Sequence, residues 1–286
     1  MKLIATDLDG TLLNDKGNIS IENAQAIRKA LKQGVQVVVA TGRTYDAANK
    51  PLQEVGLSLP IISLNGANTY TEDKKLLRDI PMDRSTCKEI QFFCQKENMY
   101  FELFTSKGIF SLSRDDFKTV IMDIMITAHP DISKEELEIA VDQRFQDEDV
   151  QFIKDYDELF KDETIQLYKL LAFSLDEELL QKARLQFEAD SNVKITSSGS
   201  INLEFNDPQA QKGIALSLFA ETLQIDMKDV MALGDNYNDL SMLTMAGRGV
   251  AMGNADEVIK EQCTHTTKRN SENGVAHAIE EMLAEL

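Results

Sequence analysis

The chain has 286 residues, enough for two domains, and 43% of them are hydrophobic, which is the balance of a globular protein. Its formal charge of −18 at pH 7 disfavours nucleic acid and anionic membranes as partners, because both are negatively charged themselves. No run is apolar for long enough to cross a bilayer, and the acidic Asp7 leaves no room for a signal-peptide core, so we expect a cytoplasmic protein. The three cysteines have neither metal-ligand nor disulfide spacing and are expected to be reduced.

The first third of the chain alternates between strand and helix patterns. Ser20 would cap the first helix and Gly34 would end it. A second helical segment contains Pro51, where we expect a break. In chain order, we predict a strand at Leu3–Thr6, a helix at Glu22–Gln33, a strand at Val35–Ala40, a helix at Thr44–Val55 and a strand at Pro60–Leu64. This rhythm is typical of a parallel sheet with helices on both faces.

The last third of the chain repeats this rhythm. We predict helices at Gly213–Leu223, Asp239–Met245, Ala255–Gln262 and Gly274–Leu286, and strands at Val230–Leu233 and Gly249–Met252. The two terminal thirds are therefore expected to form the halves of one doubly wound sheet.

The middle of the chain has a different texture, with paired strands separated by tight turns. We predict strands at Tyr100–Phe104, Gly108–Leu112 and Gln166–Phe173, a hairpin of Val193–Thr196 with Ile201–Phe205, helices at Thr86–Gln95, near Phe117–Ile126 and at Glu177–Phe187, and a linker at His129–Ser133. The predicted fold class is α/β. A doubly wound, mainly parallel sheet core (residues 1–81 and 207–286) would carry an inserted α+β domain (residues 82–206).

The first cluster of chemical interest is the segment Asp7–Thr11, which follows the first predicted strand. Two carboxylates two residues apart, next to a buried strand, are costly without a cation or hydrogen-bond donors. An Asx turn at Asp9 would be the structural alternative. A calcium-binding EF-hand loop fails on spacing, because it requires Gly where Leu12 lies and Glu where Asn18 lies.

Two weaker clusters carry groups that suit a phosphoryl anion. Thr41-Gly42-Arg43 follows the second predicted strand, and its hydroxyl and backbone N–H could grip a phosphoryl oxygen; an ordinary turn is equally consistent. Lys212 lies at the start of a predicted helix, where positive charge is unfavourable unless an anion lies nearby. Taken alone, Lys212 is better interpreted as a solvated surface residue.

The fourth cluster, Gly234–Asp239, follows the strand predicted at Val230–Leu233. Asp235, Asn238 and Asp239 offer the hard oxygen ligands that magnesium prefers in proteins. Helix capping by Asn or Asp would explain one of these residues but not the set. In open parallel sheets, ligands bind at the edge where strands end, which is where all four clusters are expected to lie.

Taken together and in this order, the four clusters resemble the motifs of the haloacid dehalogenase superfamily. The match is close to the Cof-type hydrolases of that superfamily, phosphatases that carry a large α+β cap domain, and it covers essentially the whole chain. The matching segments are Asp7–Leu13, Thr41–Arg43, Lys212-Gly213, Gly234–Asp239 and, in the tail, Ala251–Ala255 and Glu272–Val275.

The resemblance implies a role for each matching residue. Asp7 would be the nucleophile, forming an aspartyl-phosphate, and Asp9 would be the acid and base. Mg²⁺ would be held by the Asp7 carboxylate, the Asp9 main-chain carbonyl and Asp235, with Asp239 supporting it from nearby. The phosphoryl group would be bound by Thr41, the Gly42 N–H, Lys212, Asn238 and the main chain at Leu8.

The resemblance leaves alternatives of activity and substrate. A phosphomutase would share the nucleophile, the acid/base and the metal, and a non-catalytic binding protein could use the same fold. Dehalogenation is disfavoured by Asp9. The inserted domain is expected to choose the leaving group of a small phosphorylated metabolite: a sugar phosphate, a phosphorylated flavin or flavin precursor, or pyridoxal phosphate. No obligate protein partner is evident from the sequence.

Overall fold

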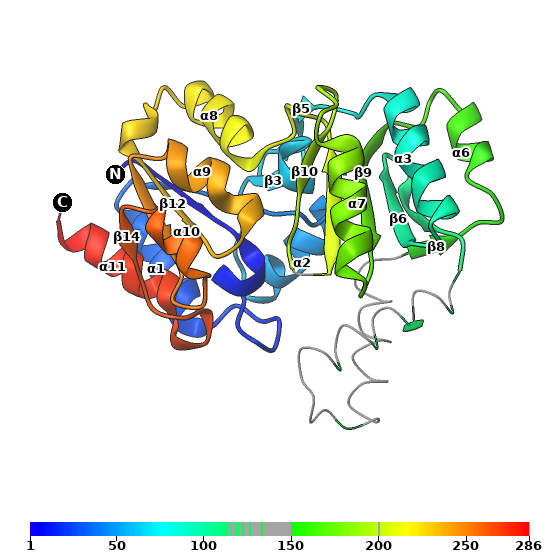
Figure 1. Cartoon of the computed structure of the whole chain (residues 1–286). Helices are drawn as coiled ribbons and strands as arrows, with labels where there is room; N and C mark the ends of the chain where they lie inside the picture. Colours follow the sequence, from blue (N-terminus) through cyan, green and yellow to red (C-terminus); the bar gives the residue numbers. More distant parts are fainter. Residues whose placement is uncertain are drawn as a thin grey trace. The chain divides into compact units, whose positions relative to one another are not determined.

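The computed structural model describes residues 1–113, 150–199 and 201–285, with a few further positions between 115 and 133. The helix predicted near Phe117–Ile126 and the linker predicted at His129–Ser133 fall largely outside these residues. The chain divides into two compact units, one formed by Met1–Ile80 with Gln209–Leu286 and the other by Pro81–Pro208. We call them the core unit and the insert (Figure 1).

The core unit contains an eight-stranded sheet in the order β14-β13-β12-β1-β2-β3-β4-β5. Its strands are β1 (Leu3–Thr6), β2 (Gln36–Ala40), β3 (Ile61–Ser63), β4 (Asn68–Tyr70), β5 (Leu76–Asp79), β12 (Val230–Gly234), β13 (Arg248–Ala251) and β14 (His265–Thr266). Its helices are α1 (Ile21–Lys32), α2 (Tyr45–Glu54), α8 (Lys212–Thr222), α9 (Leu240–Met245), α10 (Glu257–Glu261) and α11 (Gly274–Ala284).

Helices cover both faces of this sheet, as the apolar strands require. The side chains of Ile4, Val37 and Met231 belong to one apolar cluster, with α1, α2 and α11. The alternate residues Leu3 and Val38 belong to a second, with α8, α9 and α10. Successive side chains of a strand point to opposite faces, so these strands are apolar throughout.

The predicted mainly parallel sheet is confirmed, but two local details differ from expectation. Strands β4 and β5, which pair antiparallel with β3 and with each other, form its antiparallel edge. Neither strand was predicted: Asn68–Tyr70 has only three residues, and Leu76–Asp79 is largely exposed and has no apolar alternation. Helix α2 continues through Pro51 without the predicted break. Pro51 is buried, so packing against the core offsets the one backbone hydrogen bond that proline cannot donate.

Two helices of the core unit, α1 and α2, begin at capping residues. The Ser20 side chain accepts a hydrogen bond from the Asn23 N–H at 3.1 Å, which confirms the predicted cap of α1. Thr44 caps α2 in the same way, through the Ala47 N–H at 3.4 Å. Each cap satisfies a backbone N–H group at the start of its helix, so α1 and α2 can begin directly after the preceding loop.

The insert contains a six-stranded sheet in the order β10-β11-β9-β6-β7-β8, antiparallel except for the β7–β8 pair. Its strands are β6 (Tyr100–Thr105), β7 (Gly108–Ser111), β8 (Val150–Phe152), β9 (Leu167–Phe173), β10 (Lys194–Thr196) and β11 (Asn202–Asn206). Its described helices are α3 (Arg84–Lys96), α6 (Asp157–Lys161) and α7 (Glu177–Phe187). The fold class, a mainly parallel core with an α+β insert, is confirmed.

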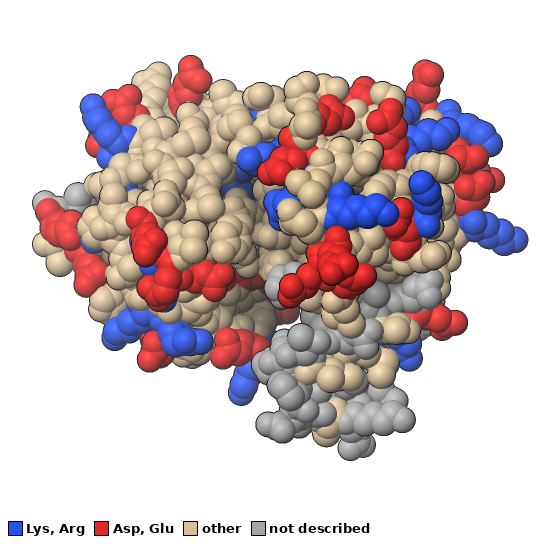
Figure 2. All heavy atoms as spheres, in the orientation of Figure 1, with Lys and Arg blue, Asp and Glu red and all other residues tan. Residues whose placement is uncertain are grey.

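One face of the insert sheet is apolar and packs against α3 and α7, through residues such as Leu103, Leu170 and Phe205. The other face carries buried polar residues, among them Lys169 and Glu204. No helix among the described residues is long and apolar enough to span a membrane. On the face drawn in Figure 2, acidic and basic side chains are interspersed over the described part of each unit.

Candidate active site

Three of the four motif clusters lie at the carboxyl ends of adjacent core strands, and the fourth, Lys212-Gly213, begins helix α8. Asp7 follows β1, Thr41 follows β2 and Asp235 follows β12. β1 lies between β2 and β12. The strands that follow β1 in sequence, β2 and β3, lie on one side of it, and the later strands β12, β13 and β14 lie on the other side. Such a switch in strand order opens a crevice at the sheet edge, which is the usual ligand site of this architecture.

The turn that follows Asp7 places the Thr11 side chain against Asp235. Residues Leu8–Leu12 form one wide helical turn in which the Leu13 N–H donates to the Leu8 carbonyl at 2.9 Å. Gly10 has a φ of 73°, and a Cβ there would lie 2.3 Å from Asp235 Oδ2, so only glycine fits. Thr11 Oγ1 donates to Asp235 Oδ1 at 2.8 Å. The turn is therefore packed directly onto the fourth motif.

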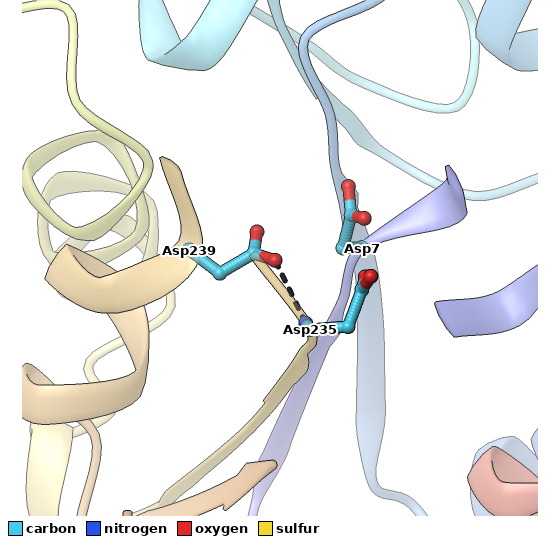
Figure 3. Close-up of side chains that lie close together, drawn as sticks. All are labelled: Asp7, Asp235 and Asp239. Atoms are coloured by element: carbon cyan, nitrogen blue, oxygen red, sulfur yellow. Dashed lines mark hydrogen bonds between the residues drawn. The ribbon is translucent and has the colours of Figure 1, made fainter. Parts of the chain in front are cut away.

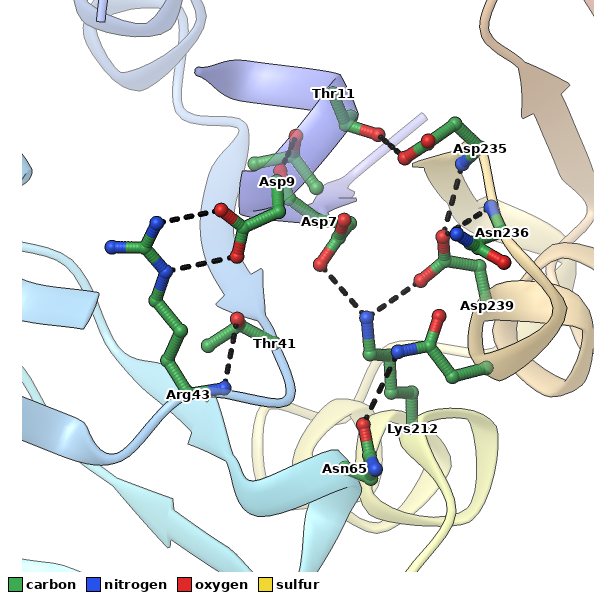
Figure 4. A network of polar contacts seen from close by, with 12 residues as sticks. Asp7, Asp9, Thr11, Thr41, Arg43, Asn65, Lys212, Asp235, Asn236 and Asp239 are labelled. Atoms are coloured by element: carbon green, nitrogen blue, oxygen red, sulfur yellow. Dashed lines mark hydrogen bonds and ion pairs between the residues drawn. The ribbon is translucent and has the colours of Figure 1, made fainter. Parts of the chain in front are cut away.

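Three carboxylates converge at this edge of the sheet. Asp7, Asp235 and Asp239 can each offer one oxygen such that all three lie within 4.8 Å of one another (Figure 3). Lys212 Nζ lies between two of them, 2.8 Å from Asp7 Oδ1 and 2.7 Å from Asp239 Oδ1 (Figure 4). The Lys212 side chain is fully buried, so its interpretation as a solvated surface residue is wrong.

Asp239 is held more completely than its two neighbours. Its Oδ2 accepts hydrogen bonds from the Asp235 N–H at 2.9 Å and the Asn236 N–H at 3.0 Å, and its Oδ1 accepts from Lys212. These contacts shape the turn that presents Asp235. Asp239 is thus better placed to support this turn than to reach out to a ligand.

Burial and mutual repulsion shift the titration of these groups. Burial raises the pKa of Asp7 well above its ordinary value; Lys212 opposes this, and Asp239 and Asp235 add to it. Burial, then Asp239, raises the pKa of Asp235 to about 7. Burial disfavours the Lys212 ammonium, but Asp239 and Asp7 hold the pKa of Lys212 above its ordinary value. Three carboxylates face one ammonium, and a divalent cation would neutralise the excess negative charge.

Asp9 is more exposed than Asp7, Asp235 and Asp239. Its carboxylate is more than half exposed and is gripped at both oxygens by Arg43, at 2.8 Å from Nε and 2.6 Å from Nη2 (Figure 4). Such a bidentate pair fixes the orientation of the carboxylate as well as its charge. This ion pair joins the first motif, which contains Asp9, to the second motif, which contains Arg43.

The remaining predicted residues surround this centre. Thr41 is buried at the end of β2, and its Oγ1 accepts from the Arg43 N–H at 3.2 Å, which shapes the turn around the half-buried Gly42. Asn238 is buried, and its Nδ2 donates to Asn65 Oδ1 at 3.4 Å. Leu8 is fully buried behind Asp7.

Sequence reasoning missed three residues that hold the site together. Thr11 contacts Asp235, Asn254 Nδ2 donates to the Gly10 carbonyl at 2.8 Å and reaches Asp235 Oδ2 at 3.4 Å, and Asn65 contacts Asn238. Asn254 lies in the tail segment of the resemblance, but without an assigned role. Asn65 directly follows the strand predicted at Pro60–Leu64, so the rule that strand ends carry ligands would have found it.

Comparison with known proteins identifies the family of this chain. The family model of haloacid dehalogenase-like hydrolases matches residues 4–279. The chain belongs to this hydrolase family. It is 36% identical to phosphatase YwpJ of Bacillus subtilis, over 99% of this chain and 100% of that protein. It is also 36% identical to the 5-amino-6-(5-phospho-D-ribitylamino)uracil phosphatase YwtE of the same organism, over 99% of both chains.

A solved structure supports the same placement. The structure of a haloacid dehalogenase-like hydrolase from B. subtilis superposes with a TM-score of 0.91 at 36% identity, over 99% of this chain and 100% of that one. The resemblance inferred from the motifs is therefore confirmed. This chain is a phosphatase of the haloacid dehalogenase-like family, and its buried carboxylate cluster indicates a divalent metal site.

Proposed function

We propose that this protein hydrolyses phosphate monoesters of small metabolites, with Mg²⁺ as cofactor and Asp7 as nucleophile. The observation that carries the proposal is the position of Asp7, buried at the switch point of the sheet, 2.8 Å from Lys212 and beside Asp235. An anionic nucleophile can approach an anionic phosphoryl group only where positive charge offsets the repulsion. Lys212 supplies such charge at this place.

The phosphoryl pocket would be built from groups of all four motifs. Lys212 would contact the phosphoryl oxygens, and the hydroxyl of Thr41, the Gly42 N–H, the Asn238 amide and the main chain at Leu8 would complete the set. Most of these residues are buried at one sheet edge, so their hydrogen bonds would be made away from water. A phosphoryl group has several acceptor oxygens, which matches this set of donors.

The residues present fit Mg²⁺, which prefers a few carboxylate oxygens and keeps several waters. The Asp7 and Asp235 carboxylates and the Asp9 main-chain carbonyl would hold it, and Asp239 would support the turn that carries Asp235. Both Asp235 oxygens are already oriented, by Thr11 and Asn254. When bound, the ion would neutralise charge that develops on the phosphoryl oxygens.

Asp9 would move the protons of the reaction. In the first step, an Asp7 carboxylate oxygen bonds to phosphorus, the bond from phosphorus to the ester oxygen breaks, and Asp9 protonates the departing alkoxide. In the second step, Asp9 takes a proton from water, whose oxygen bonds to phosphorus as the bond to Asp7 breaks. The products are an alcohol and inorganic phosphate, with Asp7 restored as a carboxylate.

The insert would act as the cap that selects the leaving group. The four motifs handle the phosphoryl end, so leaving-group recognition falls to other residues. The face of the insert sheet opposite α3 and α7 carries buried amide side chains, among them Asn202 and Asn206, which suit a polar metabolite. YwtE, which acts on a flavin-precursor phosphate, makes that class the first to test, beside sugar phosphates and pyridoxal phosphate.

Phosphate release tests the proposal. Wild type and Asp7→Asn would be assayed with p-nitrophenyl phosphate and a panel of sugar, flavin-precursor and cofactor phosphates, with Mg²⁺ and with a chelator. We expect release that requires Mg²⁺ and falls by at least about 10³-fold in Asp7→Asn. Rearranged substrate without free phosphate would indicate a phosphomutase instead. A folded wild type that binds Mg²⁺ but converts no ester would overturn the proposal.

A further inference from the structure

A short strained segment, Leu64-Asn65-Gly66, follows strand β3 at the same sheet edge. Its three residues have φ values of 49°, 56° and 101° in succession. Glycine and asparagine tolerate this region, but a leucine there is a genuine outlier. Such conformations persist only where the surroundings hold them, and they concentrate at functional sites.

Backbone contacts tie this segment to two of the motifs. The Leu64 N–H donates to the Arg43 carbonyl and the Asn65 N–H to the Thr41 carbonyl, each at 3.0 Å. A Cβ on Gly66 would lie 2.6 Å from the carbonyl oxygen of Gln211, the residue before Lys212. The strained conformation therefore packs the Thr41 turn and the start of α8 against one another.

The Asn65 side chain reaches a third motif. Asn65, which is labelled in Figure 4, is 2% exposed, and its Oδ1 accepts the hydrogen bond from Asn238 Nδ2 at 3.4 Å. The buried Oδ1 of Asn238 has no hydrogen-bond partner within the described part of the chain. A half-turn of both amides would keep one hydrogen bond between the side chains, now donated by Asn65, and would pair that oxygen. The Asn238 NH₂ would then point to where its unpartnered oxygen lies now.

We propose that Asn65 is a positioning residue that presents the Asn238 amide to the phosphoryl group of the substrate. The inference rests on the proposed function and adds a residue outside the four motifs. Asn65 acts through Asn238: its side chain accepts from the Asn238 NH₂ in this structure and would donate to the Asn238 oxygen when phosphate is bound. The backbone of the same residue holds the turn that carries Thr41, so two phosphoryl contacts depend on one position.

Asn65→Gly separates the side chain from the backbone. Glycine adopts a φ of 56° without strain, so the variant deletes the amide and keeps the turn. Alanine would add backbone strain and confuse the two effects. Asn98 provides a matched control, because it is an exposed asparagine with a φ of 54° in the insert. Asn98→Gly makes the same chemical change away from the four motifs.

The primary measurement is the Kd of inorganic phosphate by calorimetry in the presence of Mg²⁺, with KM and kcat for p-nitrophenyl phosphate alongside. For Asn65→Gly we expect Kd and KM to rise by about tenfold. Asn238→Ala is expected to weaken phosphate binding to a similar extent. Because the two residues act as a unit, Asn65→Gly/Asn238→Ala should be no weaker than Asn238→Ala. Asn98→Gly should match wild type.

Each other outcome has a definite meaning. An additive double variant, or a lower Tm with unchanged Kd, would overturn the positioning role and make Asn65 merely structural. A raised KM with an unchanged phosphate Kd would overturn it too, because Asn65 would then contact the leaving group. A wild type that binds phosphate but releases none from any ester would overturn the proposed function alone, since the Kd comparison would still test Asn65.

Discussion

Each unit of the molecule buries a lysine against carboxylates, but the two lysines acquire their partners differently. In the insert, Lys169 Nζ lies 3.0 Å from Glu204 Oε1 and 4.3 Å from the centre of the Phe104 ring. Phe104 is the direct cross-strand neighbour of Lys169, and Glu204 is on the strand at its other side. The register of three adjacent strands is enough to bring these groups together.

The partners of Lys212 come from distant parts of the chain. Asp7 is 205 residues away and Asp239 is 27 residues away, and they lie on loops after two different parallel strands. No strand pairing requires these side chains to meet. A lysine placed by sheet register has a sufficient structural explanation, whereas one that gathers carboxylates from separate loops at a switch point indicates a site.

The largest effect is expected from Lys212→Met. Methionine fills a similar volume but leaves Asp7 and Asp239 without their ammonium, so the phosphoryl charge loses its partner. We expect kcat/KM for p-nitrophenyl phosphate to fall by at least about 10³-fold. Lys228→Met, at an exposed ion pair, should have no effect. A kcat/KM within tenfold of wild type would mean that Lys212 has a structural role like that of Lys169, and would contradict the distinction between the two lysines.

Lys169→Met should act on stability. The variant leaves Glu204 buried without its cation, and we expect the free energy of unfolding to fall by about 3–5 kcal/mol in urea titrations. Lys169→Met/Glu204→Leu should recover most of the loss, because an apolar pair removes the buried carboxylate that had lost its cation. If the double variant is no more stable than the single one, the pair is not a self-contained structural unit.

A smaller effect is expected from Asn254→Ala. The change removes the donor that contacts the Gly10 carbonyl and Asp235 Oδ2, so Asp235 loses part of its orientation. We expect the Kd of Mg²⁺ to rise by about 10- to 100-fold in calorimetry. Asn192→Ala, at an exposed position of the insert, serves as the control. An unchanged Kd would mean that Thr11 alone is enough to orient Asp235.

The smallest expected effect is a pH dependence of the stabilisation by Mg²⁺. The pKa of Asp235 is raised to about 7, so the metal-free folded state binds more protons than the unfolded chain between about pH 4 and pH 7. Its stability should therefore fall as pH rises through this window. Bound Mg²⁺ replaces the proton, so the increase in Tm caused by Mg²⁺ should grow from pH 5 to pH 8. Asp235→Asn should reduce this growth, and a constant increase in wild type would contradict the prediction.

Local patterns predicted most elements closely. The helix at Glu177–Phe187 has the predicted bounds, and the strands at Leu3–Thr6 and Leu167–Phe173 were predicted to within a residue. Their apolar periodicity is strong because one or both faces are buried. Val150–Phe152 and Leu76–Asp79 are among the strands that were missed. They are short and largely exposed, and pairing with a neighbouring strand rather than their own pattern defines them.

The positions of the candidate site residues were also predictable, because the four motifs follow one another in a fixed order along the chain. The sequence alone determined the mainly parallel core, the inserted α+β unit and the motif positions, since periodicity and motif spacing are local properties. The tertiary structure decided which of these residues meet: Lys212 between Asp7 and Asp239, Arg43 on Asp9, and Asn65 beside Asn238. Such contacts depend on the packing of loops that are far apart in the chain, and no local pattern encodes that packing.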